Sequence, residues 1–223
     1  MSVSQQDFDR ALNTMAEIEQ RDPFYWMAIN LIQNGFEYEG FLLILATWNF
    51  ASFRYILRDF DIELFKAVIQ DAKNALGRNL LWDWENNNGI TLFDAWDSGD
   101  GPQRIARAFD ILATEPVTQT TNRGLGPTGA AKVIHFFNPN LFVMWDQYIR
   151  QHAGRVLGIC DVHGRPKRYE KSGKTSGNLY VEFLRDMRAT FQGLRFPKGK
   201  PIGKAIDEYN YVNITLRMLQ RQK

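Results

Sequence analysis

The chain has 223 residues, of which 44% are hydrophobic and 23% are charged, and its formal net charge is +2. This composition is typical of a water-soluble protein, and the length allows one globular unit or two lobes that share a cleft. The longest apolar run, residues 40–46, is far too short to span a bilayer, so we expect no membrane partner.

Residues that serve disulfides and metal sites are scarce. The single cysteine, Cys160, excludes an internal disulfide and a four-cysteine cluster site. The three histidines, His135, His152 and His163, lack the spacing of metal ligands. The N-terminus lacks the apolar core of a signal peptide. We therefore expect a cytoplasmic monomer with no metal and no cofactor.

Charge is divided unevenly along the chain. Residues 1–149 hold 11 Lys and Arg against 19 Asp and Glu, which gives −8. Residues 150–223 hold 16 against 6, which gives +10. A basic segment of this kind favours a polyanionic partner, although a solvated basic surface produces the same pattern.

Hydrophobic periodicity and turn signals predict an all-α chain without strands or internal repeats. Residues 40–58 form one long predicted helix, which is apolar nearly all round and therefore expected to be buried. Residues 76–100 are irregular, and their tryptophans either wall a binding pocket or pin a surface loop. The other expected helices span residues 4–20, 24–33, 59–75, 101–113, 127–137, a segment beginning at Asp146, 179–191 and 204–219.

Residues 122–150 carry the most informative pattern. Gly124 and Gly126 supply backbone freedom, and Pro127 suits the first position of a helix. The free N–H groups at such a helix start favour an anion such as a phosphate, and Lys132 adds charge to the same helix. Asp146 lies 20 residues after Gly126 and, as a favoured N-cap, is expected to begin the next helix.

This arrangement resembles the helix-hairpin-helix DNA glycosylase superfamily of the endonuclease-III-like type. In that family a Gly-x-Gly hairpin grips one DNA strand, and a catalytic aspartate follows at the start of the next helix. Residues 124–126 match the hairpin, and Trp145-Asp146 with Ile149-Arg150 resembles the aspartate region. The match is confined to residues 122–150. Some members carry an iron–sulfur cluster, which a chain with one cysteine cannot ligate in that way.

The resemblance implies an enzyme that hydrolyses the N-glycosidic bond of a modified or damaged base flipped out of double-stranded DNA. Such an enzyme would act on the nucleoid in base excision repair. Asp146 would activate water or stabilise the sugar cation, as carboxylates do in glycoside hydrolysis. The expected parts are a core helical lobe at residues 24–113, the hairpin and aspartate region at 114–155, a basic loop insertion at 154–178, C-terminal helices at 179–223, and a DNA-binding cleft between two lobes.

Individual roles follow from the resemblance and from residue type. The catalytic candidates are Asp146 and Lys132. The expected DNA contacts are Gly124, Leu125, Gly126, Thr128, Gly129, Lys132, Arg150, Arg165, Lys167 and Arg168. The expected walls of a base pocket are Trp48, Asn49, Trp145, Tyr25 and Trp26, although a place in the core explains most of the aromatic residues equally well. The 154–178 loop either reaches over DNA phosphates or is a basic loop with no specific role.

Two departures from the family pattern bear on mechanism. Members that also cut the strand carry a lysine two residues after the second hairpin glycine, where this chain has Thr128, and the family's histidine after the aspartate is absent. The first departure favours a monofunctional glycosylase with water as nucleophile. Lys132, on the same helix face, leaves a bifunctional enzyme open.

A non-catalytic DNA-binding protein, in which Asp146 only caps a helix, is the other alternative. Pocket shape does not follow from the sequence. Oxidised, alkylated, deaminated and phage-type hypermodified bases therefore all stay open as substrates.

Overall fold

The computed structural model describes residues 3–19, 22–170 and 176–221, and these residues form helices and loops with no strand. The predicted all-α class is confirmed. None of the described helices has the length and apolarity needed to cross a membrane. The elements are α1 (Gln5–Ile18), α2 (Asp22–Gln33), α3 (Glu37–Trp48), α4 (Phe50–Phe53), η1 (Leu57–Asp59), α5 (Ile62–Leu76), η2 (Arg78–Leu80), α6 (Gly101–Thr114), α7 (Gly126–Phe137), α8 (Gln147–Leu157), α9 (Gly177–Phe191), α10 (Ile202–Asn210), η3 (Tyr211–Leu216) and α11 (Arg217–Gln220).

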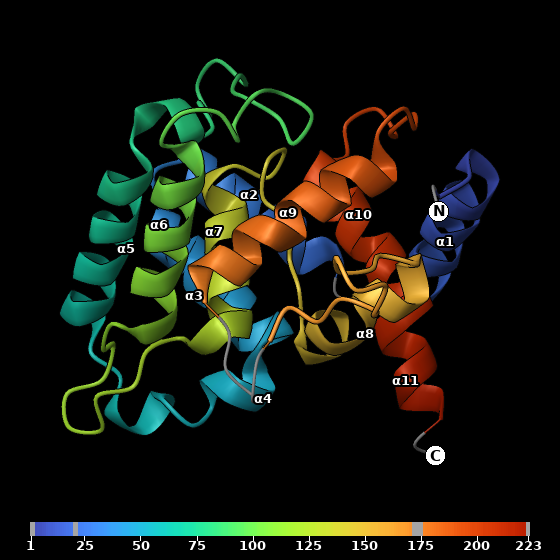
Figure 1. Cartoon of the computed structure of the whole chain (residues 1–223). Coiled ribbons are helices and arrows are strands. Elements are labelled where there is room, and N and C mark those ends of the chain that lie inside the picture. The colour runs from blue at the N-terminus through green and yellow to red at the C-terminus, as the bar shows by residue number, and fades with distance from the viewer. Residues whose placement is uncertain (1–2, 20–21, 171–175, 222–223) are drawn as a thin grey trace.

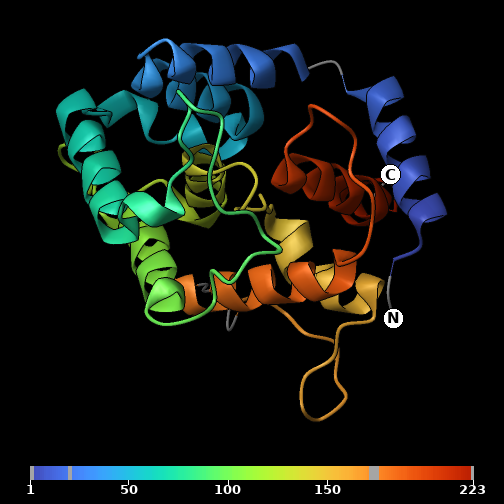
Figure 2. The same cartoon turned by 90° about the horizontal axis from the view of Figure 1, so that it is seen from above.

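Two groups of helices pack against a shared apolar core. In the first, α2 packs on α3, α5 on α6, and α6 on α7 and α9 (Figure 1). In the second, α1, α10 and α8 surround η3, and the C-terminal helices lie beside α1 (Figure 2). The N-terminal helix α1 therefore packs against the C-terminal part of the chain.

Glycines lie where one backbone segment approaches another closely. A Cβ atom at Gly177, the first residue of α9, would collide with the backbone of Ala106 in α6. A Cβ at Gly154 in α8 would collide with the backbone of Lys167. Both glycines are required for close backbone approach, so the basic loop that contains Lys167 is packed against α8.

The predicted helix at residues 40–58 is wrong in its second half. Helix α3 ends at Trp48, because Asn49 leaves helical geometry with φ −130° and ψ 17°. Asparagine competes with the helical backbone for hydrogen bonds, and burial is no longer continuous after it, since Phe50 is 53% exposed while Phe53 and Ile56 are buried. The break gives α4 and η1 in place of a continuous helix.

The C-terminal helix differs from its prediction in a second way. The run from Ile202 to Gln220 is helical, as expected for residues 204–219, but Tyr211–Leu216 is a π-helix. Such wide turns are uncommon and occur frequently at functional sites. The wide turn changes which side chains share a face of this helix.

His135 is a titratable side chain in the core and has no exposed surface. The carbonyl oxygen of Phe142, 2.6 Å from Nδ1, can only accept, so Nδ1 carries the proton. Nε2 then accepts from the Tyr25 hydroxyl at 2.8 Å. Burial lowers the pKa of His135 to about 3, so the ring is neutral in the folded protein.

We expect His135 to make folding stability sensitive to acid. The unfolded chain binds the proton below its ordinary pKa of about 6.5, whereas the folded chain does not until about 3, so stability is lost as pH falls. This histidine should remove about 2 kcal/mol between pH 7 and 5. Denaturant unfolding of wild type and His135→Gln should show a shallower pH dependence for the variant. An unchanged slope would contradict a buried neutral ring, and His163→Gln, on an exposed loop, is the matched control.

Candidate functional site

The glycine turn before α7 is built as a tight, anchored loop. Gly126 has φ +70°, which favours glycine, and it is half-exposed at the helix start. A Cβ at Gly124 would lie 2.6 Å from the carbonyl oxygen of Ala113, so this glycine lets the turn pack on the end of α6. Leu125, the N-cap residue, makes no side-chain hydrogen bond to the first turn of α7. The backbone N–H groups of that turn thus lack a side-chain cap.

The loop that leads to this turn is held by Asp59. Its Oδ2 accepts from the backbone N–H groups of Thr120 and Thr121, at 2.9 and 2.8 Å, and from both hydroxyls. The N–H groups and hydroxyls of these threonines lower the pKa of Asp59 to about 2. The sequence placed Asp59 at the start of the next helix, but Asp61 caps that helix instead. Asp59 therefore holds in place the loop that precedes the glycine turn.

Two side-chain bonds fasten the start of α7 to the start of α8. The Trp145 Nε1–H donates to the carbonyl oxygen of Pro127 at 3.0 Å. The Arg150 Nη1–H donates to the Thr128 hydroxyl at 2.9 Å. Trp145 and Arg150 flank Asp146 in the sequence, and Pro127 and Thr128 follow Gly126. The two bonds therefore hold the glycine turn close to the segment that contains Asp146. The start of α8, the lower end of α7 and α4 share one side of the molecule (Figure 1).

Asp146 is the N-cap of α8, as the sequence predicts. Its Oδ1 accepts from the Ile149 N–H at 2.8 Å, and its Oδ2 accepts from the Thr215 hydroxyl at 2.7 Å. The carboxylate is half-buried and keeps lone pairs for further donors. Thr215 belongs to the π-helix η3 and is a site residue that the sequence gave no reason to select.

Beside Asp146 lies a charged junction, defined as Trp48, Lys132, Lys204 and Asp207. The Lys132 and Lys204 Nζ atoms lie 5.4 and 4.3 Å from the centroid of the Trp48 ring. Asp207 lies within electrostatic reach of both lysines and of Asp146, and part of its surface meets solvent. Burial raises the pKa of Asp207 to about 6 against the opposing effect of the two lysines. The junction joins α3, α7 and α10.

Two of the side chains expected to contact DNA, Arg150 and Lys132, are buried. Arg150 is 7% exposed, bound to Thr128 and 3.7 Å from Glu170, so it fastens helices and is not presented to phosphate. Burial also lowers the pKa of its guanidinium. Lys132 is 8% exposed, and its ammonium lies over Trp48. Phosphate contacts require exposed donors, so neither side chain is a backbone contact in this conformation.

The other hairpin residues divide in the same way. Gly129 and the Leu125 side chain are buried, and a Cβ at Gly129 would meet the Asn49 amide nitrogen at 3.1 Å. Gly129 therefore brings the end of α3 onto α7. Arg123, which the sequence analysis did not select, is exposed beside the turn. The outward parts of the turn are Arg123, Gly124, Gly126 and Thr128.

The five residues expected to wall a base pocket differ in their surroundings, and the pocket itself stays a prediction. Tyr25 and Trp145 are 0% and 1% exposed and pack in the core, so neither offers a free ring face. Trp26 lies on the outside of α2, where its Nε1–H donates to Asp22 at 3.0 Å. Trp48 and Asn49 lie at the end of α3 where it meets α7, against Lys132 and Gly129.

The basic loop is partly described. Helix α8 extends to Leu157 and α9 begins at Gly177, so the loop is shorter than residues 154–178, and its residues 171–175 lie outside the described part. A single antiparallel bridge joins Cys160 and Pro166, and this end of the loop projects from the body (Figure 2). Its basic residues have acidic partners: Arg165 with Asp161 at 3.0 Å, Lys167 with Asp186 at 2.8 Å, and Arg168 with Glu170 at 3.6 Å. Each of these three basic side chains is thus paired with a carboxylate, although the excess of +10 in residues 150–223 already includes these acids.

An exposed surface that mixes aromatic and basic residues lies on α4 and η1. Phe50 and Tyr55 are 53% and 59% exposed, and Arg54 and Arg58 are exposed between and beside them. Helix α4 contacts α7, so this surface adjoins the glycine turn. It was hidden in the sequence by the assumption that residues 40–58 form one buried helix.

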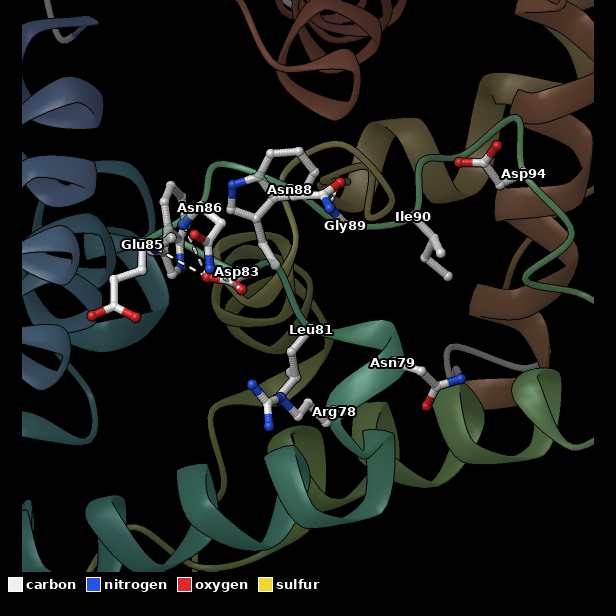
Figure 3. Close-up of a pocket in the computed structure, with 12 residues that line it drawn as sticks. Arg78, Asn79, Leu81, Asp83, Glu85, Asn86, Asn88, Gly89, Ile90 and Asp94 are labelled. Atoms are coloured by element: carbon white, nitrogen blue, oxygen red, sulfur yellow. Dashed lines mark hydrogen bonds between the residues drawn. The ribbon is translucent and has the colours of Figure 1, made fainter.

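A hollow of about 670 Å³ lies at the other end of α7 (Figure 3). The Trp82 N–H, in its wall, donates to the carbonyl oxygen of Phe137, the last residue of α7. Asp83, Glu85 and Asn86 line one side, and Asp94 lines the other (Figure 3). The 76–100 loop therefore does not wall the space around Asp146.

No cluster of three or more His, Cys, Asp or Glu side chains suited to a metal ion occurs within the described ranges. The candidate site therefore consists of the Asp146 carboxylate, which caps α8, the glycine turn and the charged junction. Comparison with family models, with curated proteins and with solved structures found no match to this chain.

Proposed function

We propose that this protein is a monofunctional DNA glycosylase of the helix-hairpin-helix type that hydrolyses the N-glycosidic bond of a flipped modified base. The observation that carries the proposal is the pair of bonds from Trp145 to Pro127 and from Arg150 to Thr128. They hold the glycine turn and Asp146 at one edge, as base excision requires of a strand-gripping turn and a reacting carboxylate.

In this proposal the uncapped start of α7 and the exposed Arg123 bind phosphates, and the α4–η1 surface lies against the duplex. The flipped nucleotide enters between the two helix groups, with its base beside Trp48 and its sugar beside Asp146. The carboxylate then stabilises positive charge on the sugar and receives the proton of the attacking water.

A non-catalytic DNA-binding protein is the second candidate, and one observation favours it. Both Asp146 oxygens already accept hydrogen bonds, from Ile149 and Thr215, as a purely structural cap would. The test is base release: mass spectrometry of bases freed from duplexes with oxidised, alkylated, deaminated or glucosylated bases. Release of any one base supports the enzyme, and duplex binding with no release across the panel supports the second candidate.

DNA binding should weaken steeply as salt rises, because phosphate contacts release counterions. Arg123→Ala should lower the affinity equally for all duplex sequences. It should also reduce the slope of log K against log salt by about 1, the contribution of one phosphate contact. Fluorescence anisotropy between 50 and 300 mM salt, roughly the range in which such losses are large, measures both. Arg10→Ala, which removes a 68% exposed arginine from α1, is the control. A slope unchanged by Arg123→Ala would remove the glycine turn from the interface.

A further inference from the structure

We infer that Thr215 is a positioning residue of the site, whose hydroxyl holds the Asp146 carboxylate in the orientation that meets the sugar. This inference rests on the proposed function and extends the site to the C-terminal part of the chain. It starts from the two hydrogen bonds that the Asp146 carboxylate accepts.

The two oxygens of this carboxylate are bound from two distant parts of the chain. Oδ1 accepts from the Ile149 N–H at 2.8 Å, within the first turn of α8. Oδ2 accepts from the Thr215 hydroxyl at 2.7 Å, which belongs to η3. The last side-chain torsion of an aspartate has a broad energy minimum, so one bond leaves the plane of the carboxylate free to turn. The second bond, on the other oxygen, therefore fixes that plane.

Capping of α8 does not account for the bond from Thr215. An N-cap needs an oxygen that accepts from the first turn of its helix, and Oδ1 of Asp146 supplies it. The Thr215 hydroxyl binds the other oxygen and comes from another helix. Asp61, the cap of α5, also accepts a second bond, from Gln119 at 3.0 Å, but that bond is exposed to water. The bond from Thr215 differs in being buried on the side of its donor.

The surroundings of this bond favour a fixed orientation. Thr215 is 4% exposed, so water does not compete for its hydroxyl. An ionised carboxylate can only accept, so the hydroxyl donates, and a hydrogen bond to a charged acceptor is stronger than one between neutral groups. Asp146 itself is half-buried, and its oxygens keep lone pairs for further donors. Thr215 thus orients the carboxylate and leaves part of it open to a ligand.

The segment that carries Thr215 is a wide helical turn with side-chain bonds of its own. Tyr211–Leu216 is a π-helix, a rare form that occurs frequently at functional sites. The Asn213 Nδ2 donates to the carbonyl oxygen of Tyr209 at 3.1 Å, and the Arg217 Nη2 donates to the Asn213 Oδ1 at 2.9 Å. The same turn packs against α8 (Figure 1). The donor therefore lies on a segment that is held along its own helix and against α8.

The test separates DNA binding from chemistry. Thr215→Val keeps the branched shape of the side chain and removes the hydroxyl. Single-turnover release is measured from duplexes that carry uracil, 8-oxoguanine or N7-methylguanine, and fluorescence anisotropy gives the affinity for the same duplexes. We expect Thr215→Val to slow release by about 10- to 100-fold, because misplacing a reacting group has an effect of this size. The affinity should stay within about twofold of wild type, since phosphate contacts position the DNA. Thr215→Ser, which keeps the hydroxyl, should recover most of the lost rate.

Thr190→Val is the matched control. Thr190 is 6% exposed, and its hydroxyl donates at 2.7 Å to the carbonyl oxygen of Asp186 within α9. This variant should leave base release unchanged, even where its melting temperature falls. Equal slowing by both valine variants, no slowing by Thr215→Val, or no recovery in Thr215→Ser would overturn the role of Thr215 while leaving the glycosylase proposal intact. A wild-type protein that binds these duplexes and releases none of the bases would instead refute hydrolysis, and the role of Thr215 with it.

Discussion

Asp146→Asn should bind modified duplex as well as wild type and release its base about 10²- to 10⁴-fold more slowly. The fold should survive, because the asparagine oxygen still accepts from the Ile149 N–H and asparagine is as good an N-cap as aspartate. The Thr215 hydroxyl can accept from the new amide where it formerly donated to the carboxylate. What the variant loses is the negative charge beside the sugar and the acceptor for a water proton.

Single-turnover base release and anisotropy on the same duplex separate these effects. Asp100→Asn is the matched control, since Asp100 is also a helix N-cap but its side chain is 78% exposed and makes no capping bond. Full turnover by Asp146→Asn would move the chemistry to another residue. A parallel loss of DNA binding and thermal stability would show that Asp146 serves only as the cap of α8.

Local signals in the sequence were sufficient for much of the fold. Ser4 and Asp146 each cap a helix through a contact three residues ahead, so each start depends only on its neighbours. The all-α class and the start of α7 at the glycine turn follow from the same kind of signal. The break at Asn49 did not follow, because apolar residues continue past it and the exposure of Phe50 depends on the fold and not on the sequence pattern.

The site was less accessible to the sequence because its contacts are long-range. Thr215 reaches Asp146 across 69 positions, and it lies in a π turn that the sequence did not predict. Arg150 was expected to bind phosphate because of its charge. Its guanidinium instead contacts Thr128 and Glu170, both of which are distant in sequence. One signal was available: Asp207 and Glu208 are two of only six acidic residues after position 149. Acidic residues retained in a basic segment favour an internal partner over a solvated surface.

Glu208→Gln should cost about 3 to 5 kcal/mol of unfolding free energy, because it removes one partner from a buried charge cluster. Glu208 is 2% exposed and binds Lys200 at 2.6 Å and Lys204 at 3.0 Å. Lys204 has no exposed surface, and once Glu208 is neutral its remaining ion pair within the described residues is the one with Asp22, at 3.1 Å. The glutamine has nearly the same shape, so the cost measures charge left uncompensated and not a cavity.

Urea unfolding of Glu208→Gln, Lys204→Met and the double variant tests this cluster. The double variant should be more stable than the sum of the single losses predicts, by at least about 1 kcal/mol, because it removes the buried charge of Lys204 together with that of its partner Glu208. Glu63→Gln is the control: its partner Lys66 lies at a comparable 2.8 Å, but both side chains are largely exposed. That pair should contribute less than about 1 kcal/mol. Since the ion-pair distances are similar, equal losses at the two sites would mean that burial does not govern the strength of these ion pairs.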